Sequence, residues 1–215
     1  MTNLFSSFDP CTGTFSLNWL SSFIFIFIKP YKFWMKNNIS YLVFIKILKN
    51  LHAEFKLIMS YNGSNLMILS MFFMILIINS IGLVPYIFTS SSHLIFSLSL
   101  SLPLWMGLMI YGWFMKTNFM LAHLLPTGSP VLLMPFLVLI ELTSNLIRPG
   151  SLAVRLSANM IAGHLLMSLM GSNSNFSLMF ILMLLFMMFM LFELAVAFIQ
   201  SYVFVTLMTL YSSEI

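Results

Sequence analysis

Charge is scarce in this 215-residue chain, in which only 7% of the residues are charged and 60% are hydrophobic. Soluble domains usually carry about a quarter charged residues, so this composition excludes an ordinary soluble domain. No acid or strong base occurs between Lys56 and Lys116. Because roughly 20 apolar residues can cross the ~30 Å hydrocarbon core of a bilayer, the sequence predicts an all-α membrane protein with several spans. The alternating pattern of a membrane β-barrel is absent.

Cysteine is almost absent as well. Cys11 is the only one, which excludes a disulfide framework and a paired-cysteine metal site. No phosphate-binding loop or nucleophile motif occurs, so we expect no cofactor, no metal and no catalytic residue in this chain. The first residues, MTNLFSSFDP, have neither the basic start of a secretory signal nor the arginines of a transit peptide.

The basic residues are concentrated in one part of the chain. Six of the nine strong bases lie from Lys29 to Lys56. A basic segment beside membrane spans is typical of the inner face of a bilayer, so the net charge of +4 indicates a lipid surface and no nucleic acid. On a helix from about residue 40, apolar residues lie opposite the lysines, which predicts an amphipathic interfacial helix within 31–60. These apolar residues are Phe44, Ile47, Leu48, Leu51, Phe55 and Ile58.

The other apolar segments predict a single membrane-embedded domain over 1–215. A first span is expected at 11–28, and two more, at 65–88 and 94–115, fill the segment 65–115. A connector rich in proline and glycine follows at 116–130. With the C-terminal third, this gives about five membrane-embedded helices plus the interfacial one.

The C-terminal third, residues 130–211, contains two long helical stretches. Residues 130–168 and 176–211 would measure about 58 Å and 54 Å at ~1.5 Å per residue. Neither can stand upright in a ~30 Å hydrocarbon core, so we expect a strongly tilted helical hairpin. Whether the Pro149–Gly150 pair breaks the first helix is left open by the sequence.

Most of the intramembrane ionisable residues lie on this hairpin. The first helix carries Glu141, Arg148, Arg155 and His164, and the second carries Glu193, with Gln200 seven residues later. Charges at membrane depth cost several kcal/mol each, so they mark pathways or partner contacts. A single ion pair between helices would not require so many polar groups.

Helical spacing sorts these residues by face. Arg155 and Asn159 share a face, whereas His164, nine residues from Arg155, points to the opposite side. Glu193 and Gln200 share a face of the second helix. Glu141, Asn145 and Arg148 are predicted to lie near the Arg155 face if Pro149 does not rotate the helix. Small residues near Arg155 are expected to let another helix approach closely; they are Ser157, Ala158, Ala162 and Gly163.

Three segments carry a resemblance to a known family. AVRLSANMIAGHLL, the upstream FLVLIELTSNLIRPGSLAVRL and the closing FELAVAFIQSYVFVTL resemble subunit a of the F-type ATP synthase, and MTNLFSSFDP resembles its mitochondrially encoded version. The resemblance covers the whole chain and is strongest over 138–209. It implies a non-catalytic, proton-translocating stator subunit in the mitochondrial inner membrane. The implied partners are the c-subunit ring, other membrane-sector and peripheral-stalk subunits, lipid and protons.

The resemblance also implies residue roles. Arg155 would face the ring and separate two offset proton half-channels. A guanidinium stays protonated and lowers the pKa of a nearby carboxylate, so Arg155 would make each ring carboxylate release its proton and would block direct leakage. His164 and Glu193 are placed in the inlet half-channel on the intermembrane-space side, and Glu141 near the matrix outlet.

The remaining polar residues are less constrained. Asn159 and Gln200 would hold water or orient Arg155. Arg148 fits either a second channel cation or a lipid headgroup contact, and both remain open. His52 and His123 are expected at the membrane interface.

Two other functions compete with this interpretation. A proton-pumping subunit of a respiratory complex usually has lysines inside its spans, but Lys116 is the only lysine after Lys56. A secondary transporter should show paired repeats, and none is visible. A purely structural anchor would not need Arg155.

Overall fold

The structure is a computed structural model that describes residues 4–11, 13–26, 38–59, 63–84, 86–125, 130–172 and 179–214. Within these ranges all regular elements are helices and no strand occurs, as the sequence predicts. The α-helices are α1 (Ile39–Ile58), α2 (Ser64–Gly82), α3 (Leu94–Met115), α4 (Thr117–His123), α5 (Met134–Ser172) and α6 (Met179–Glu214). Short 3-10 helices are η1 (Leu4–Phe8), η2 (Leu17–Ile26), η3 (Ser90–Ser92) and η4 (Val131–Leu133).

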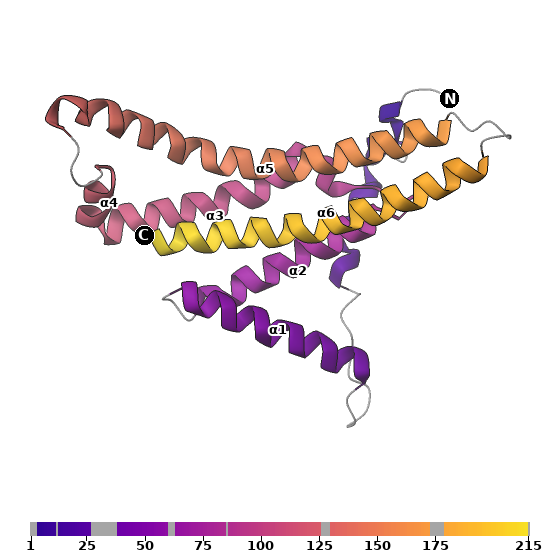
Figure 1. Cartoon of the computed structure of the whole chain (residues 1–215), viewed down its shortest axis with the longest axis horizontal. Helices are drawn as coiled ribbons and strands as arrows, with labels where there is room; N and C mark the ends of the chain where they lie inside the picture. The colour runs from indigo at the N-terminus through magenta and orange to yellow at the C-terminus, as the bar shows by residue number, and fades with distance from the viewer. Residues whose placement is uncertain are drawn as a thin grey trace.

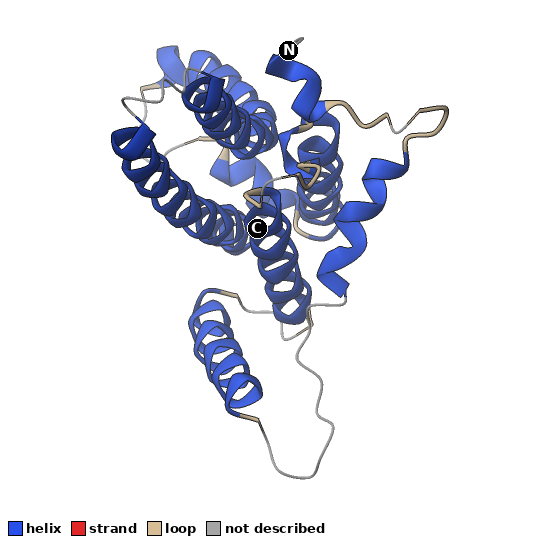
Figure 2. Ribbon diagram, turned by 90° about the vertical axis from the view of Figure 1, so that its right-hand side faces the viewer, coloured by secondary structure: helices blue, strands red, loops and turns tan. Residues whose placement is uncertain are grey.

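Four of the described helices, α2, α3, α5 and α6, are long and apolar enough to cross a membrane. They form a bundle in which α3 packs against α5 and α2 packs against α6. Figure 2 shows the long helices of this bundle nearly end-on. α1 lies at one edge of the bundle, on the side away from α5, and contacts α2 and α6 (Figure 1).

The core of the bundle joins side chains from α1, α2, α5 and α6. In lipid, helices associate through van der Waals packing more than through expulsion of water, so close fit at these positions holds the bundle together. The buried cluster consists of Phe55, Leu69, Phe72, Ile75, Leu152, Leu156, Phe204, Val205 and Met208.

Pro149 does not break α5, which answers the question that the sequence left open. The helix runs through 39 residues and follows a curved course (Figure 1). Proline lacks an N–H and crowds the carbonyl four residues earlier, here that of Asn145, and bending accommodates this. Pro135 lies in the first turn of α5, where an N–H would have no partner within the helix.

The helix boundaries follow the sequence prediction with small shifts. α3 coincides with the predicted 94–115, whereas α2 ends at Gly82, six residues before the predicted end at 88. α5 begins and ends four residues later than the predicted 130–168. α6 is described from Met179 and ends three residues after the predicted end at 211.

Several predicted segments are described only in part. η2 lies within the predicted first span 11–28, but ten residues of 3-10 helix at ~2.0 Å each give only about 20 Å, less than a membrane crossing. The span at 11–28 therefore stays a prediction, as does the membrane position of α1. Parts of the predicted segments lie outside the described residues; these are 12, 27–28, 31–37, 60, 85, 126–129 and 176–178.

α5 and α6 run antiparallel and form the predicted C-terminal hairpin (Figure 1). At ~1.5 Å per residue, their 39 and 36 residues correspond to about 58 Å and 54 Å. Both lengths exceed the hydrocarbon thickness, so the hairpin must tilt strongly or extend beyond the apolar layer.

Candidate functional site

One face of α5 is not covered by any described part of the chain. Arg155 and Asn159 are exposed on this face, together with the small side chains of Ala158 and Ala162. The opposite stripe of the helix, which includes Ala153 and Met160, is buried against the bundle. The structure therefore presents Arg155 outward, on a low surface that another helix can approach.

Two of the small residues expected beside Arg155 lie elsewhere. Gly163 and Ser157 are buried on the covered side of α5, so the prediction that they lower the surface near Arg155 is wrong for both. Eight residues place Gly163 about 80° from Arg155 around the helix, and two residues place Ser157 about 200° away. Only Ala158 and Ala162 share the Arg155 face.

His164 points toward the covered side of α5, as its nine-residue separation from Arg155 predicts. Its imidazole forms a hydrogen bond with the backbone of Gly82, at the end of α2. The Phe8 ring meets it edge-on at 6.1 Å between ring centroids. Its Nε2 atom is buried and has no hydrogen-bond partner among the described residues.

His164 also lines a large cavity of about 820 Å³ at one end of the bundle. The walls come from the N-terminal segment, the α2–α3 connection, and the ends of α5 and α6 that meet there. Besides His164, the polar lining residues are Ser6, Ser7, Asp9, Asn18, Tyr86, Thr89, Ser168 and Ser172. A cavity of this size with several hydrogen-bonding groups can hold water.

Glu193 lies next to Gly163, where α6 crosses the covered side of α5. A Cβ atom placed on Gly163 would stand 2.5 Å from Cδ of Glu193 and 2.9 Å from Oε2. Glu193 is 8% exposed, and its Oε1 atom has no hydrogen-bond partner in the described part of the chain. Glycine at 163 thus leaves the space that the carboxyl group occupies.

Gln200 shares the Glu193 face of α6, as predicted, and is also buried. Ala197 lies between them on the same buried face. The structure thus separates the two carboxamides that the sequence grouped, because Asn159 lies on the open face of α5 and Gln200 on the covered side of α6.

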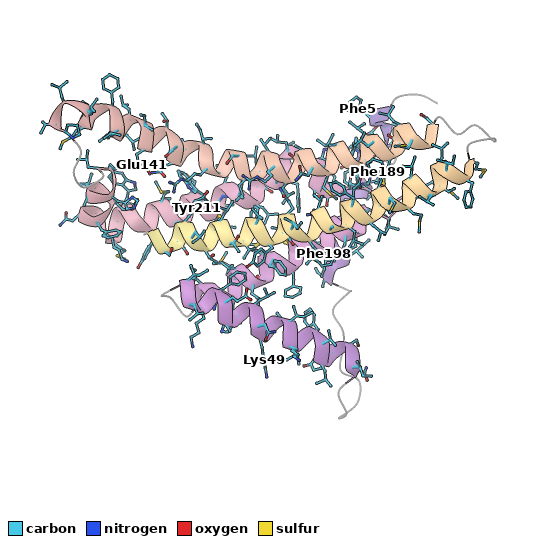
Figure 3. The ribbon with its side chains drawn as sticks, in the orientation of Figure 1. Phe5, Lys49, Glu141, Phe189, Phe198 and Tyr211 are labelled. Atoms are coloured by element: carbon cyan, nitrogen blue, oxygen red, sulfur yellow. The ribbon has the colours of Figure 1, made fainter. Side chains whose placement is uncertain are left out.

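Glu141, Asn145 and Arg148 gather at the opposite end of the bundle. Arg148 Nη2 lies 3.5 Å from Glu141 Oε1, and the Arg148 guanidinium carbon lies 4.9 Å from the centroid of the Tyr211 ring on α6. Figure 3 shows Glu141 and Tyr211 at this same end. Arg148, for which the sequence left two roles open, therefore pairs with a carboxylate on its own helix and stacks on α6.

Two cavities meet at Glu141. A small one of about 40 Å³ contains Glu141, Asn145, Arg148 and Tyr211 among its lining residues. A wider one of about 540 Å³ lies between α4 and the first turns of α5. Glu141 and His123 line both cavities. His123, which the sequence predicted only as an interfacial residue, thus shares its surroundings with an ionisable group.

Several buried polar groups were not singled out from the sequence. Asn79 on α2 is 1% exposed, and neither amide atom has a hydrogen-bond partner among the described residues. The Ser91 and Ser101 hydroxyls are likewise unpartnered there. An asparagine inside an apolar helix was a visible signal, whereas serines are common in helices and in turns. Buried polar atoms of this kind usually bind water.

Arg155 lies between the two ends along α5. At ~1.5 Å per residue, it is about 21 Å from Glu141 and about 14 Å from His164. Each end has a cavity with polar residues, and Arg155 belongs to neither. Among the residues that the structure describes, no three His, Cys, Asp or Glu side chains gather as metal ligands would.

Comparison with known proteins identifies the family. The family model described as ATP synthase A chain matches residues 15–213. ATP synthase subunit a of Anopheles gambiae is 50% identical over 224 aligned positions, which cover 100% of this chain and 99% of the relative. The Aedes aegypti and Drosophila melanogaster subunits are 51% and 52% identical, with the same coverage. The chain therefore belongs to the ATP synthase subunit a family, the proton-translocating stator subunits of the ATP synthase membrane sector.

Proposed function

We propose that Arg155 faces the ring of c subunits and separates two proton half-channels at opposite ends of α5. The observation that carries this proposal is the position of an exposed arginine between two polar cavities, one containing His164 and the other Glu141. A proton cannot cross the gap along α5 without a carrier, because a guanidinium stays protonated and passes no proton. A moving ring carboxylate is such a carrier.

The family assignment also decides between the functions that the sequence allowed. It favours the ATP synthase stator over a respiratory proton pump or a secondary transporter. The chain is a multi-pass protein of the mitochondrial inner membrane, and the nucleotide chemistry of the complex belongs to other subunits.

The two cavities open toward different sides of the membrane in this proposal. The lysines of α1 support a position of that helix on the matrix surface, and Lys49 points away from the bundle in Figure 3. Successive spans alternate in direction, so the end of α2 at Gly82 lies toward the intermembrane space. His164, which bonds Gly82, then belongs to the inlet, and Glu141 belongs to the matrix outlet.

The proton path follows from these positions. Water in the 820 Å³ cavity delivers a proton to His164, and the neighbouring Glu193 carboxyl passes it on toward the ring. After the ring has turned, the protonated carboxyl arrives at Arg155, whose positive charge favours the ionised form. The proton leaves toward Glu141. Asn159, beside Arg155, holds water or orients the guanidinium, and Gln200, buried on α6, holds water.

Cross-linking tests the orientation of α5. Single cysteines in place of Ala158 or Ala162, in a Cys11→Ser background, should form cross-links to the c subunit in the assembled complex. Leu57→Cys on α1 is the control, because this side chain is 91% exposed on the opposite side of the bundle and should not reach the ring. Cross-linking of position 57 with none at 158 and 162 would overturn the proposal.

The other subunits of the membrane sector and peripheral stalk would bind the remaining exposed faces.

A further inference from the structure

We propose that His123 is the terminal proton-exchanging group of the matrix outlet, linking Glu141 to matrix water. This inference rests on the proposed function, because it adds a residue to the outlet half-channel. It comes from the two adjoining cavities at the matrix end of the bundle, which share His123 and Glu141 in their walls.

The small cavity has the properties of a water site. Its volume of about 40 Å³ exceeds the ~10–15 Å³ that a single water requires. Glu141, Asn145, Tyr211 and His123 supply hydrogen-bonding groups around it, and a buried water needs two to four such partners. Trp105 and Met109 from α3 help to close the remaining sides. A water here would connect the Glu141 carboxyl group to the imidazole.

The wide cavity leads outward from the same two residues. Its other walls are apolar side chains of α4 and of the first turns of α5, such as Phe119, Leu137 and Ile140. Such walls offer no alternative group for proton exchange. His123 is exposed, at the last residue of α4, so its ring can exchange with solvent while remaining in the cavity wall.

The charges around Glu141 explain why a second group is useful. Arg148 pairs with Glu141 at 3.5 Å, and the guanidinium is held in place by stacking on Tyr211. A proton that reaches Glu141 must therefore pass on to another acceptor. The imidazole of His123 can accept a proton on one nitrogen and donate one from the other, which suits it to this step.

The proton transfer is balanced at each step. The protonated Glu141 carboxyl donates its proton, through the water, to the free ring nitrogen of neutral His123. The imidazolium then releases the proton of its other nitrogen to matrix water, which leaves His123 as its other neutral tautomer. Proton exchange with water restores the first tautomer before the next transfer. Glu141 returns to the carboxylate, and no other group changes. During ATP hydrolysis the same steps run in reverse.

The test uses inverted inner-membrane vesicles, whose matrix face is exposed to the medium, and respiration-driven ATP synthesis per assembled complex. His123→Gln keeps a similar size but cannot titrate. We expect synthesis to fall about tenfold, less than the 10²–10⁴ of an obligatory acid–base group, because water can partly replace the ring. Added imidazole should restore much of the rate. His52→Gln on α1 is the matched control and should neither lose synthesis nor respond to imidazole.

A structural role of His123 is tested separately. The His123 and Phe119 rings pack at 6.4 Å, so Phe119→Leu removes this contact and keeps the titratable group. Wild-type synthesis in Phe119→Leu supports the inference. If Phe119→Leu reproduces the loss, or if imidazole fails to restore His123→Gln, the inference is wrong. Should His123→Gln fail to assemble, His123→Asn is measured with the same readouts.

The same assay distinguishes a failure of the inference about His123 from a failure of the proposed function. Arg155→Lys tests the function, because it alters the residue that meets the ring. Loss of synthesis in Arg155→Lys together with normal synthesis in His123→Gln would overturn the role of His123 and leave the function intact. Normal synthesis in Arg155→Lys would instead contradict the proposed function.

Discussion

Gly163 and Glu193 meet across the α5–α6 hairpin, with the glutamate carboxyl group in the space that any side chain at 163 would fill. This contact fixes where α6 crosses α5 and which way the Glu193 carboxyl points. His164 follows Gly163 directly, so the contact also brings the two proposed inlet groups to one part of the hairpin. The absence of a Cβ at 163 is thus a condition of the proposed proton path.

Gly163→Ala should impair proton movement while preserving the complex. The added Cβ would overlap the Glu193 carboxyl group, which must rotate or push α6 outward. Overpacking of this kind costs about 1–3 kcal/mol, which a large assembled complex can tolerate. A displacement near 1 Å in a reacting group can lower a rate about 100-fold, so we expect a loss of ten- to 100-fold in ATP-driven proton pumping.

The matched control for this substitution is Gly150→Ala. A Cβ at Gly150, on the same helix, has no atom within 4 Å. Gly150→Ala should therefore pump at the wild-type rate. If the two variants behave alike, the contact between positions 163 and 193 does not govern the path.

His164 and Glu193 should act on one proton path. Replacing either His164 by Ala or Glu193 by Gln should slow proton flux. The fold-loss of proton flux in the double variant should be smaller than the product of the two single-variant fold-losses, because serial parts of one relay are not independent. The measurement is passive proton conductance of the membrane sector after removal of the nucleotide-binding head. If the double variant instead shows the full product of the two single fold-losses, the two residues act on separate paths.

The sequence predicts elements and faces well here because lipid imposes simple rules. Long apolar runs predicted α3, α5 and α6 to within four residues, and helical spacing placed Arg155 and His164 on opposite sides of α5. Contacts between helices were harder to predict from the sequence. Nothing in the spacing indicates that Gly163 faces Glu193, since that depends on how α6 crosses α5.

At the proposed outlet end, around Glu141, contacts between helices were likewise not predictable from the sequence. Glu141 and Arg148 lie two turns apart on one helix, so their pairing could have been foreseen from the sequence. Tyr211 and His123 join them from α6 and α4, at sequence separations that no local pattern encodes. Asn79 was visible as a polar residue in an apolar run, but only the packing of α2 shows that it is fully buried.

α1 should lie flat on the matrix surface. Lys46 and Lys49 are on the polar face of α1, opposite the apolar side that packs on α2 and α6. Cysteines at 46 and 49 in a Cys11→Ser background should react with an impermeant thiol reagent added to the matrix face. The Cys11→Ser replacement is required because Cys11 is itself exposed. Labelling of both positions only from the intermembrane space would contradict this placement.

Arg155→Lys should abolish proton-driven ATP synthesis although it keeps a nominal positive charge. Arg155 stands on the open face of α5, among alanines and Asn159, with no carboxylate of the same helix nearer than Glu141, about 21 Å along the axis. If the ring covers that face, as we propose, a lysine would be desolvated there, and burial lowers the pKa of an amine. It could then lose its proton, stop attracting the ring carboxylate and even pass a proton between the half-channels.

Arginine avoids both failures because its guanidinium keeps its proton at any relevant pH, and its fork can donate two hydrogen bonds to one carboxylate. Arg148→Lys is the matched control. Arg148 contacts Glu141 and Tyr211 within the chain, and an ammonium can still pair with Glu141, so this variant should retain most of its activity. The measurement is ATP synthesis in membranes in which assembly has been confirmed. Near-normal synthesis with lysine at 155 would show that charge alone suffices there. It would refute the need for a guanidinium and, with it, the proposed role of Arg155 as a separator that passes no proton.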